Sequence, residues 1–363
     1  MASAPETLSR ENGASPSGAL LEARHIVQEF VVKGHGGVKG GVVHAVSDVS
    51  FEIAPGETLG IVGETGSGKS TLARAIIQAP RPKSGEVIFR GENLVDLSRH
   101  DLLEARRQIQ IVFQDPFASL DPCWRVDRIV AEPMRARGTG TSAERKARVD
   151  EVLELVNLDP VVFSSRRPRQ LSGGQCQRVA IARALTMSPS LIICDEPVSS
   201  LDVLIQAQVL NLFEQLRAEL KLSYLFIAHD LALVKQVSDR VGVMHLGKLC
   251  EVGPSEEIYQ HPLHPYTAAL LTSIPSPDPF VARTRADEAI AGVEPPSPLN
   301  PPSGCRFRTR CPRAQELCAL EEPPLRELAP NHTVACHFPL EEPTMAQRVA
   351  LSAPGTHRVD VEN

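Results

Sequence analysis

A glycine-rich segment of this 363-residue chain has the residue types and spacing that suit phosphate binding. Residues Gly63–Ser70 fit the pattern G-x-x-x-x-G-K-S/T in full. Such a loop turns successive backbone N–H groups inward at a helix N-terminus, and glycine permits positive φ and close approach of the phosphate. Lys69 brings a positive charge to the outer phosphates, and the Ser70 hydroxyl is a ligand for Mg²⁺. The segment therefore predicts a nucleoside triphosphate site.

Two acidic residues form the natural partner of this loop. The apolar run Leu191–Cys194 predicts a buried strand, and Asp195 and Glu196 follow it directly. Asp195 is placed to hold the metal ion from beneath the loop, and Glu196 is placed to polarise an attacking water. Many strands end in acidic residues, so this pattern gains its weight from the phosphate loop and from the segment Leu171–Gln175.

Short apolar strands alternate with helical patterns along the chain, which predicts a mostly parallel sheet covered on both faces. The predicted strands are 42–53, 58–62, 86–90, 109–113, 191–194 and 223–228. The predicted helices are 71–78, 142–156 with Ser142 as N-cap, 175–187, 203–220 and 266–274, and a further helix begins within 253–259. Helical patterns dominate between about 115 and 185, so a helical segment is inserted into the sheet.

Composition narrows the class of protein. The chain is 42% hydrophobic and 23% charged with a formal net charge of -6, which is ordinary for a globular protein and makes no case for a nucleic-acid partner. It lacks a run of 18 apolar residues and an apolar secretion signal, so we expect a cytosolic chain that does not cross a membrane. Its eight cysteines are then expected to be thiols or metal ligands rather than disulfides.

Four further segments carry a resemblance to a known family. Leu171–Gln175 reads L-S-G-G-Q, Gln114 stands in F-Q-D-P, Ser200–Asp202 reads S-L-D, and His229 stands in I-A-H-D. Together with the phosphate loop, they resemble the ABC-type ATPase subunits over roughly residues 19–272. In that family, two subunits meet head to tail and enclose two ATP molecules, so that the signature loop Leu171–Gln175 contacts ATP bound to the partner.

The resemblance implies an α/β fold of the P-loop NTPase (ABC-type) class. We expect a mostly parallel sheet, a small antiparallel β subdomain, an inserted helical subdomain and a cysteine-containing C-terminal tail. The expected divisions are a disordered tail at 1–18, an ABC ATPase domain at 19–272 with its helical subdomain at about 115–185, a C-terminal extension at 273–345 and a second disordered tail at 346–363.

The resemblance also assigns roles to residues. The predicted catalytic residues are Glu196 and His229. The predicted ATP-binding residues are Phe30, Gly63, Glu64, Thr65, Gly66, Ser67, Gly68, Lys69, Ser70, Thr71 and Gln114. The predicted Mg²⁺ ligands are Ser70, Gln114 and Asp195; the signature loop comprises Leu171, Ser172, Gly173, Gly174 and Gln175; and the loop that touches the partner comprises Ser200, Leu201 and Asp202. Phe30 is the candidate for stacking on adenine, and its alternative place is the core of the small sheet.

Three segments resemble the oligopeptide and dipeptide importers in particular. They are Val112–Pro122, His261–Leu270 and the tail that begins at Pro301. The same branch imports nickel and glutathione-like solutes, and the ATPase does not touch the solute, so these alternatives stay open. The implied partners are a second, related ATPase subunit in a heterodimer, two transmembrane permease subunits and an extracytoplasmic solute-binding protein. The implied location is the cytoplasmic face of the cell membrane.

Four cysteines stand in the last part of the chain, at Cys305, Cys311, Cys318 and Cys336. Their spacing lacks the paired pattern of zinc sites. Four thiolates suit a 4Fe–4S cluster, which members of the dipeptide branch carry on a similar tail. The alternative is four reduced cysteines. Because this segment is short and proline-rich, we expect it to have little core of its own, which favours a metal staple.

Two classes of protein compete with an importer subunit. A soluble ABC ATPase of DNA repair or translation would carry a long coiled-coil insertion or two ATPase units, and the chain shows neither. A regulatory subunit would bind ATP without hydrolysing it, and the presence of Glu196 and His229 argues against that.

Overall fold

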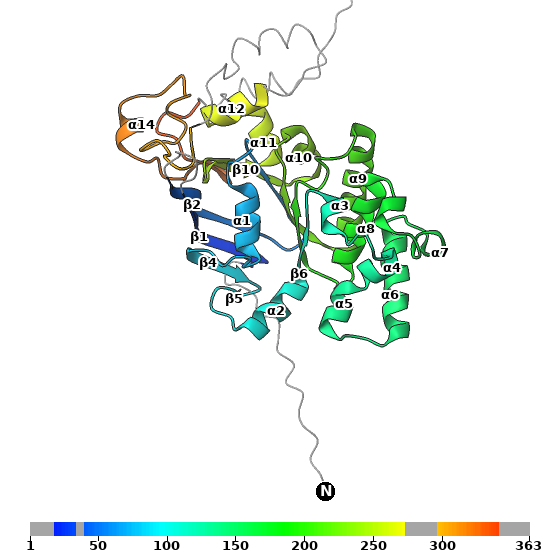
Figure 1. The fold of residues 1–363 in the computed structure, drawn as a ribbon. Coiled ribbons are helices and arrows are strands. Elements are labelled where there is room, and N and C mark those ends of the chain that lie inside the picture. The colour runs from blue at the N-terminus through cyan, green and yellow to red at the C-terminus, as the bar shows by residue number, and fades with distance from the viewer. Residues whose placement is uncertain (1–17, 34–39, 273–295, 341–363) are drawn as a thin grey trace, which may run out of the picture.

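The structure is a computed structural model that describes residues 18–33, 40–272 and 296–340 (Figure 1). The predicted tail 346–363, all but Gly18 of the predicted tail 1–18, and most of the proline-rich segment 275–302 lie outside the described residues. The glycine-rich insertion 34–41 is described only at its last two positions.

One large sheet organises the molecule. Its strand order is β11-β12-β10-β9-β3-β8-β7-β6. The bounds are β3 Thr58–Val62, β6 Ile109–Val112, β7 Leu191–Asp195, β8 Ser223–Ile227, β9 Arg240–His245, β10 Lys248–Pro254, β11 Arg326–Ala329 and β12 His332–Val334. The strands β9, β3, β8, β7 and β6 run parallel to one another, whereas β10, β12 and β11 join antiparallel. The prediction of a mostly parallel sheet is confirmed.

The central strands are apolar throughout because both faces of the sheet are covered. In β7, Leu191 and Ile193 belong to one hydrophobic cluster, and Ile192 and Cys194 belong to the other. The helix α9 (Val203–Leu220) packs on the second face. Side chains that alternate between two buried faces give a continuous hydrophobic run, which is the pattern that predicted this strand.

Helices flank the sheet on both sides (Figure 1). Besides α9, they are α1 Lys69–Ile76, α2 Arg99–Gln108, α10 Leu231–Val237, α11 Ser255–Gln260, α12 Pro265–Thr272 and α14 Leu317–Leu320. The helix α1 shares its hydrophobic cluster with the small sheet, and α10 shares its cluster with α9.

A second, antiparallel sheet has the order β2-β1-β4-β5. Its strands are β1 Leu21–Val32, β2 Gly41–Ile53, β4 Ser84–Phe89 and β5 Glu92–Asn93. The sheet lies beside α1 in Figure 1, and buried residues of β1 and β2 join the cluster that holds α1. This is the expected small antiparallel subdomain, although the chain pattern predicted only two of its strands.

The chain segment that connects β6 to β7 forms a group of helices, which lies on the right of Figure 1. They are α3 Pro116–Ser119, α4 Val126–Val130, α5 Glu132–Arg137, α6 Ser142–Leu155, α7 Pro160–Phe163, the 3₁₀ helix Pro168–Gln170 and α8 Gly173–Leu185. The N-cap of α6 is Thr141, not Ser142 as predicted. Its hydroxyl accepts from the Glu144 N–H at 3.3 Å, and the Glu144 carboxylate accepts from the Thr141 N–H at 2.6 Å. This reciprocal capping box places the helix start one residue earlier.

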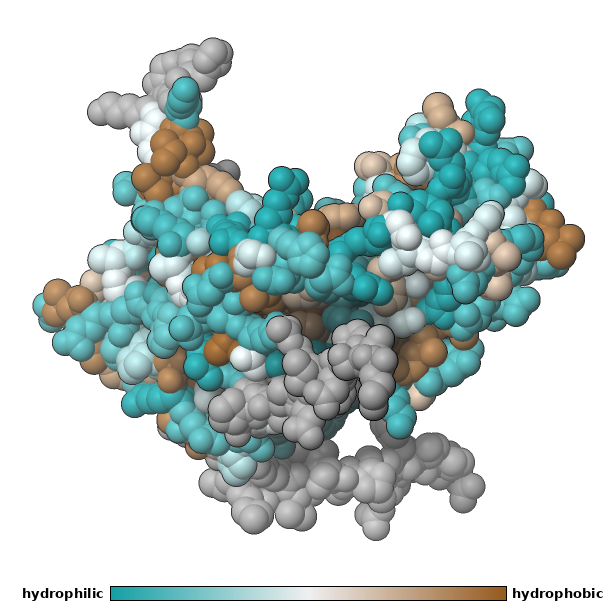
Figure 2. All heavy atoms as spheres, turned by 90° about the horizontal axis from the view of Figure 1, so that it is seen from below, coloured by the Kyte–Doolittle hydropathy of each residue, from teal (hydrophilic) through white to brown (hydrophobic). Residues whose placement is uncertain are grey.

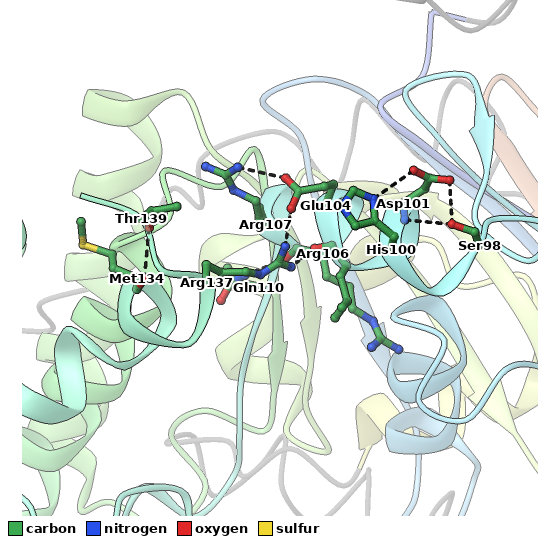
Figure 3. Close-up of polar contacts among 11 residues, drawn as sticks. Ser98, His100, Asp101, Glu104, Arg106, Arg107, Gln110, Met134, Arg137 and Thr139 are labelled. Carbon is green, nitrogen blue, oxygen red and sulfur yellow. Dashed lines mark hydrogen bonds and ion pairs between the residues drawn. The ribbon is translucent and has the colours of Figure 1, made fainter. Parts of the chain in front are cut away.

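Helix α2 connects these helices with α1, and Figure 3 shows its contact with α5 through Glu104 and Arg137. The Arg106 guanidinium donates to the carbonyl oxygens of Ile77 and Gln78, each at 2.9 Å, just past the end of α1. From α5, Arg137 forms an ion pair with Glu104 at 2.6 Å. Charged hydrogen bonds therefore tie α2 on one side to α1 and on the other to the inserted helices.

We expect Arg106→Ala to lower the free energy of unfolding by about 2 kcal/mol, because two backbone carbonyls lose a charged donor. Its neighbour provides the control: among the described residues, the Arg107 side chain pairs with Glu104 alone, three residues earlier on the same helix. Arg107→Ala should cost no more than about 0.5 kcal/mol. Urea denaturation of both variants measures the difference, and equal losses would contradict the role given to Arg106.

The C-terminal extension is part of the main fold. Its strand β12 pairs with β10 and extends the large sheet, and β11 pairs with β12. Phe307 is 1% exposed and belongs to the main hydrophobic cluster. The expectation that this segment has little core to hold it was therefore wrong. The segment is held by its pairing with the main sheet and by burial in the main hydrophobic cluster. Its own proline-rich sequence predicts neither contact.

No helix within the described ranges is long and apolar enough to cross a membrane. Seen from below in Figure 2, the visible side chains are mostly hydrophilic, and the hydrophobic ones form separate patches.

Candidate nucleotide site

The phosphate loop runs from the end of β3 to the start of α1, and close neighbours require glycine at two of its positions, Gly63 and Gly68. Gly63 has φ +152°, and a Cβ there would lie 2.0 Å from the Met244 carbonyl oxygen. Gly68 has φ +103°, and a Cβ there would lie 2.0 Å from the Ala45 carbonyl oxygen. No side chain fits at either position, so the loop follows a path that only glycine allows.

The Lys69 side chain lies inside the phosphate loop and binds two of its backbone carbonyl groups. Its ammonium donates to the carbonyl oxygen of Gly63 at 2.7 Å and to that of Glu64 at 3.0 Å. Burial lowers the pKa of Lys69, and the nearby carboxylates of Glu196 and Asp195 oppose that shift. The amine is therefore a desolvated donor inside the loop, where a phosphate oxygen would compete for it.

Ser70, in the first turn of α1, and Asp195, at the end of β7, come together as predicted although they are far apart in the sequence. The Ser70 hydroxyl donates to Asp195 Oδ1 at 2.7 Å. Asp195 is only 4% exposed, and burial raises its pKa, while the Ser70 hydrogen bond opposes the rise. One hydroxyl and one buried carboxylate are hard oxygen donors of the kind that Mg²⁺ takes beside a phosphate, so the pair fits this ion. When bound, Mg²⁺ neutralises charge on the phosphate oxygens.

The Glu196 side chain contacts two other predicted site residues, Gln114 and His229. Its Oε2 accepts from Gln114 Nε2 at 3.0 Å and lies 3.2 Å from His229 Nδ1. The Glu196 backbone has φ +50°, and its N–H donates to the Ile227 carbonyl oxygen at 2.8 Å. The ends of β6, β7 and β8 thus deliver one amide, one carboxylate and one imidazole to a single point. This arrangement can orient a water molecule and hold its proton.

The signature loop lies apart from this cluster. Ser172 caps α8: its hydroxyl accepts from the Gln175 N–H at 3.3 Å, and its own N–H donates to Gln175 Oε1 at 3.0 Å. A Cβ on Gly174 would lie 2.5 Å from a methyl group of Ile205 in α9. Over the described residues, neither a hydrogen bond nor an ion pair connects this loop with the phosphate loop. Ser172 is exposed at the start of α8, whereas Gly174 is buried against α9.

The predicted partner-contact loop, Ser200–Asp202, connects the group of Gln114, Glu196 and His229 to α9. The Ser200 hydroxyl donates to the Gln114 carbonyl oxygen at 3.4 Å, and the Asp202 carboxylate caps α9 through the Ile205 N–H at 3.0 Å. Val203 and Leu204 follow with 78% and 77% of their surface exposed. Two apolar side chains this exposed beside the loop favour a protein contact there.

Phe30 lies on β1, where it pairs with Val43 of β2, and it is 39% exposed. The ring is thus not buried in the core of the small sheet, which was its alternative place. Stacking on adenine stays a prediction.

Chain patterns missed two residues that touch the phosphate loop. The Arg310 guanidinium forms two hydrogen bonds with the Glu64 carboxylate, and the Tyr266 hydroxyl accepts from the Glu64 N–H. Tyr266 lies in the segment His261–Leu270, whose resemblance to importer ATPases was the only available signal. Nothing in the sequence connects Arg310 with a residue 246 positions earlier.

The four cysteines of the extension lie in one region, where the Cys305 N–H donates to the Cys318 carbonyl oxygen at 2.8 Å. Burial is the main cause that raises the pKa of Cys305, Cys311 and Cys336. Across the described ranges, no three His, Cys, Asp or Glu side chains are grouped to hold a metal ion. Four thiols fit an iron–sulfur cluster chemically, but their placement here does not form its site.

The fold and the site together define a P-loop ATPase of the ATP-binding-cassette class. A family profile described as ABC transporter matches residues 46–199, and one described as the C-terminal region of oligopeptide/dipeptide transporters matches residues 250–318. A dimeric ATP-binding cassette solved with ADP and Pi after hydrolysis has a TM-score of 0.57 and 29% identity, covering 65% of this chain and 98% of that one. The cbiO1 protein of Clostridium perfringens has a TM-score of 0.58 and 27% identity, covering 67% and 92%.

Relatives of similar length narrow the class. The oligopeptide transport ATP-binding protein AppF of Bacillus subtilis is 49% identical over 325 residues, which cover 88% of this chain and 97% of the relative. OppF of Haemophilus influenzae is also 49% identical, covering 87% and 96%. The chain therefore belongs to the family of ABC transporter ATP-binding proteins with the oligopeptide/dipeptide C-terminal region. It is an ABC-type ATPase, and these matches give no support to an ATPase of DNA repair or translation.

His245 at the end of β9 makes the stability depend on pH. It is 1% exposed, neither ring nitrogen has a hydrogen-bond partner within the described residues, and burial lowers its pKa from 6.5 to about 4. The charge of Glu64 opposes this shift, and Arg310, His264 and Arg306 add to it. Between these two pKa values, the unfolded chain binds a proton that the folded chain does not, so stability falls as pH drops from 6.5 to 4.

His245→Phe should remove this share of the pH dependence, up to about 3 kcal/mol. Phenylalanine preserves the ring contacts and removes no hydrogen bond. Urea denaturation across this pH range measures the effect, with His100→Phe as control because the His100 side chain is 85% exposed. An unchanged slope in His245→Phe would show that His245 titrates normally.

Proposed function

We propose that this chain hydrolyses ATP to power the import of oligopeptides or dipeptides through an ABC transporter. The observation that carries the proposal is the convergence of the Ser70–Asp195 pair and the group of Glu196, Gln114 and His229 at one edge of the sheet. The C-terminal region matching residues 250–318 and the names of the relatives support the peptide substrate. Nickel and glutathione-like solutes are the alternative cargoes, and uptake assays with each solute separate them.

The catalytic roles follow from charge and position. The triphosphate binds at 63–71, with the loop N–H groups and Lys69 on its oxygens. Glu196 accepts a hydrogen bond from the attacking water, and His229 stabilises charge on the transferring phosphoryl group. Gln114 lies at the start of the inserted helices, so its contact with Glu196 at 3.0 Å connects their position with the catalytic carboxylate.

The working unit is a pair of ATPase subunits. A complete phosphate loop and an exposed signature loop that do not meet in one chain support an exchange across a head-to-tail pair. The partner is a related but different subunit. Two transmembrane permease subunits and an extracytoplasmic binding protein complete the complex, which places this chain at the cytoplasmic face of the membrane. Residues 273–345 form its C-terminal extension in this proposal.

Glu196→Gln keeps the shape of the side chain and removes its charge. We expect it to bind ATP like the wild type and to lose ATP turnover by at least about 10²-fold, because the water loses its base. Calorimetry of the chain measures binding, and phosphate release by the purified transporter measures turnover. Glu219→Gln, on the exposed side of α9, is the control. Normal turnover in Glu196→Gln would remove Glu196 from its role.

A second variant tests whether each ATP site is shared between the two subunits of the pair. Ser172→Arg should leave ATP binding by the isolated chain unchanged and abolish turnover by the transporter, because the bulky side chain would block the partner's γ-phosphate. Undiminished turnover would contradict the shared site.

An iron–sulfur cluster on the extension stays a separate proposal. It rests on the four thiols at Cys305, Cys311, Cys318 and Cys336 and on the resemblance to the dipeptide branch, not on their placement. We expect anaerobically purified protein to contain about four iron and four sulfide per chain. Cys311→Ser should lose them, whereas Cys123→Ser, far from the extension in sequence and exposed, should not. Colourless, iron-free wild-type protein would rule the cluster out.

A further inference from the structure

The C-terminal extension touches the phosphate loop directly through Glu64, the loop's second residue. Arg310 Nη1 donates to Glu64 Oε2 and Arg310 Nη2 donates to Glu64 Oε1, both at 2.8 Å. Only 6% of the Arg310 side chain is exposed, against 29% for Glu64. Two parallel charged hydrogen bonds fix the angle between the groups as well as their distance. The pair therefore holds the loop to the extension in one orientation.

A second contact holds the backbone of the same residue. The Tyr266 hydroxyl accepts from the Glu64 N–H at 3.1 Å. Tyr266 is fully buried, and its ring packs on His245 at 4.4 Å and on Phe307 at 5.2 Å between centroids. Burial also raises the pKa of the hydroxyl, so it stays protonated. Both the main chain and the side chain of Glu64 are thus held by residues that follow β10.

These contacts continue into the ATP site. The Glu64 carbonyl oxygen accepts from the Lys69 ammonium at 3.0 Å, and the Ser67 carbonyl oxygen accepts from the Gly247 N–H at 2.8 Å. The Glu64 peptide unit therefore has the phosphate-binding lysine on one side and the extension on the other. A shift of Glu64 would move the acceptor that positions Lys69, and with it the donors that face the phosphates.

The burial of the Arg310 guanidinium also depends on its ion pair with Glu64. Its Nε is buried with no hydrogen-bond partner within the described ranges. The Glu64 carboxylate is the acceptor for both of its terminal nitrogens, and the pair lowers the pKa of Glu64. A buried guanidinium without its carboxylate is costly, so the docked extension and the ordered loop stabilise each other.

We propose that Arg310 and Tyr266 are positioning residues of the nucleotide site, through which the C-terminal extension and the preceding helix α12 set the affinity of the phosphate loop for ATP. This inference rests on the proposed function, because it concerns the same site. Binding free energies are reciprocal, so ATP must in turn strengthen the docking of the extension.

The first test is ATP affinity. Arg310→Gln should raise the Kd for Mg²⁺–ATP by at least about 5-fold in calorimetry of the full chain, and Arg310→Lys, which keeps the charge without the fork, should fall between it and the wild type. Arg308→Gln is the matched control, because Arg308 is half-buried and, among the described residues, its guanidinium donates to Ser303 within the extension and not to the phosphate loop. Combining Glu64→Gln with Arg310→Gln should cost less than the sum of the single changes.

The second test measures the reverse effect, the influence of ATP on the extension, and its main measurement is made on the wild type. The Cys305 N–H donates to the Cys318 carbonyl oxygen and the Arg308 N–H to the Cys305 carbonyl oxygen, so their exchange with solvent reports whether the extension is ordered. Mg²⁺–ATP should slow hydrogen exchange at these amides in the wild type and in Arg308→Gln. It should have no such effect in Arg310→Gln. A purely structural role would change the melting temperature without making this exchange depend on nucleotide.

The outcomes separate the two proposals. A folded wild-type chain that does not bind Mg²⁺–ATP would contradict the proposed function. A wild type that binds, together with an unchanged Kd in Arg310→Lys and Arg310→Gln, would overturn only the role of Arg310. If Arg310→Gln does not fold, wild-type exchange at Cys305 that is indifferent to ATP overturns the inference on its own.

Discussion

The hydrogen bond between the Ser70 hydroxyl and the Asp195 carboxylate joins the start of α1 to the end of β7, and the rest of the site depends on it. Because β3, β8 and β7 are parallel, their carboxyl ends meet at one edge of the sheet. The phosphate loop, the acidic pair and His229 are delivered there by separate chain segments. Any change that shifted one strand by a residue would turn its side chains to the opposite face and separate this pair.

Two parts of the fold hold the two sets of predicted site residues. Gln114, Glu196 and His229 converge beside the phosphate loop, whereas Ser172 and Gly174 present the start of α8 next to α9. In the proposed pair of subunits, the N-terminus of α8 would meet the ATP held by the other subunit. Under that proposal, closure of the pair would be a condition for hydrolysis, which is how ATP would drive motion in a membrane complex.

The C-terminal extension does not form a separate unit but packs as part of the main fold. Its strands lengthen the main sheet, and Phe307 enters the main core. A buried carboxylate, Glu251 in β10, accepts from the His264 N–H at 3.0 Å and contacts His332 of β12 at 2.7 Å. These contacts pass from β10 to the residue before α12 and to the β11–β12 hairpin, so the extension and the main sheet share one network of buried polar groups.

The phosphate loop, the signature loop and the central strands could be predicted from the sequence, because their function or burial demands particular residues at fixed local spacing. Gly63 and Gly68 admit no side chain, and β7 must be apolar on both faces. The pairing of the proline-rich extension with the main sheet and the contact of Arg310 with Glu64 became visible only in the folded chain. Glu64 was predicted as part of the phosphate loop, but nothing near Arg310 in the sequence marks it as the partner of a residue 246 positions away. Long-range packing, which no local pattern encodes, brought them together.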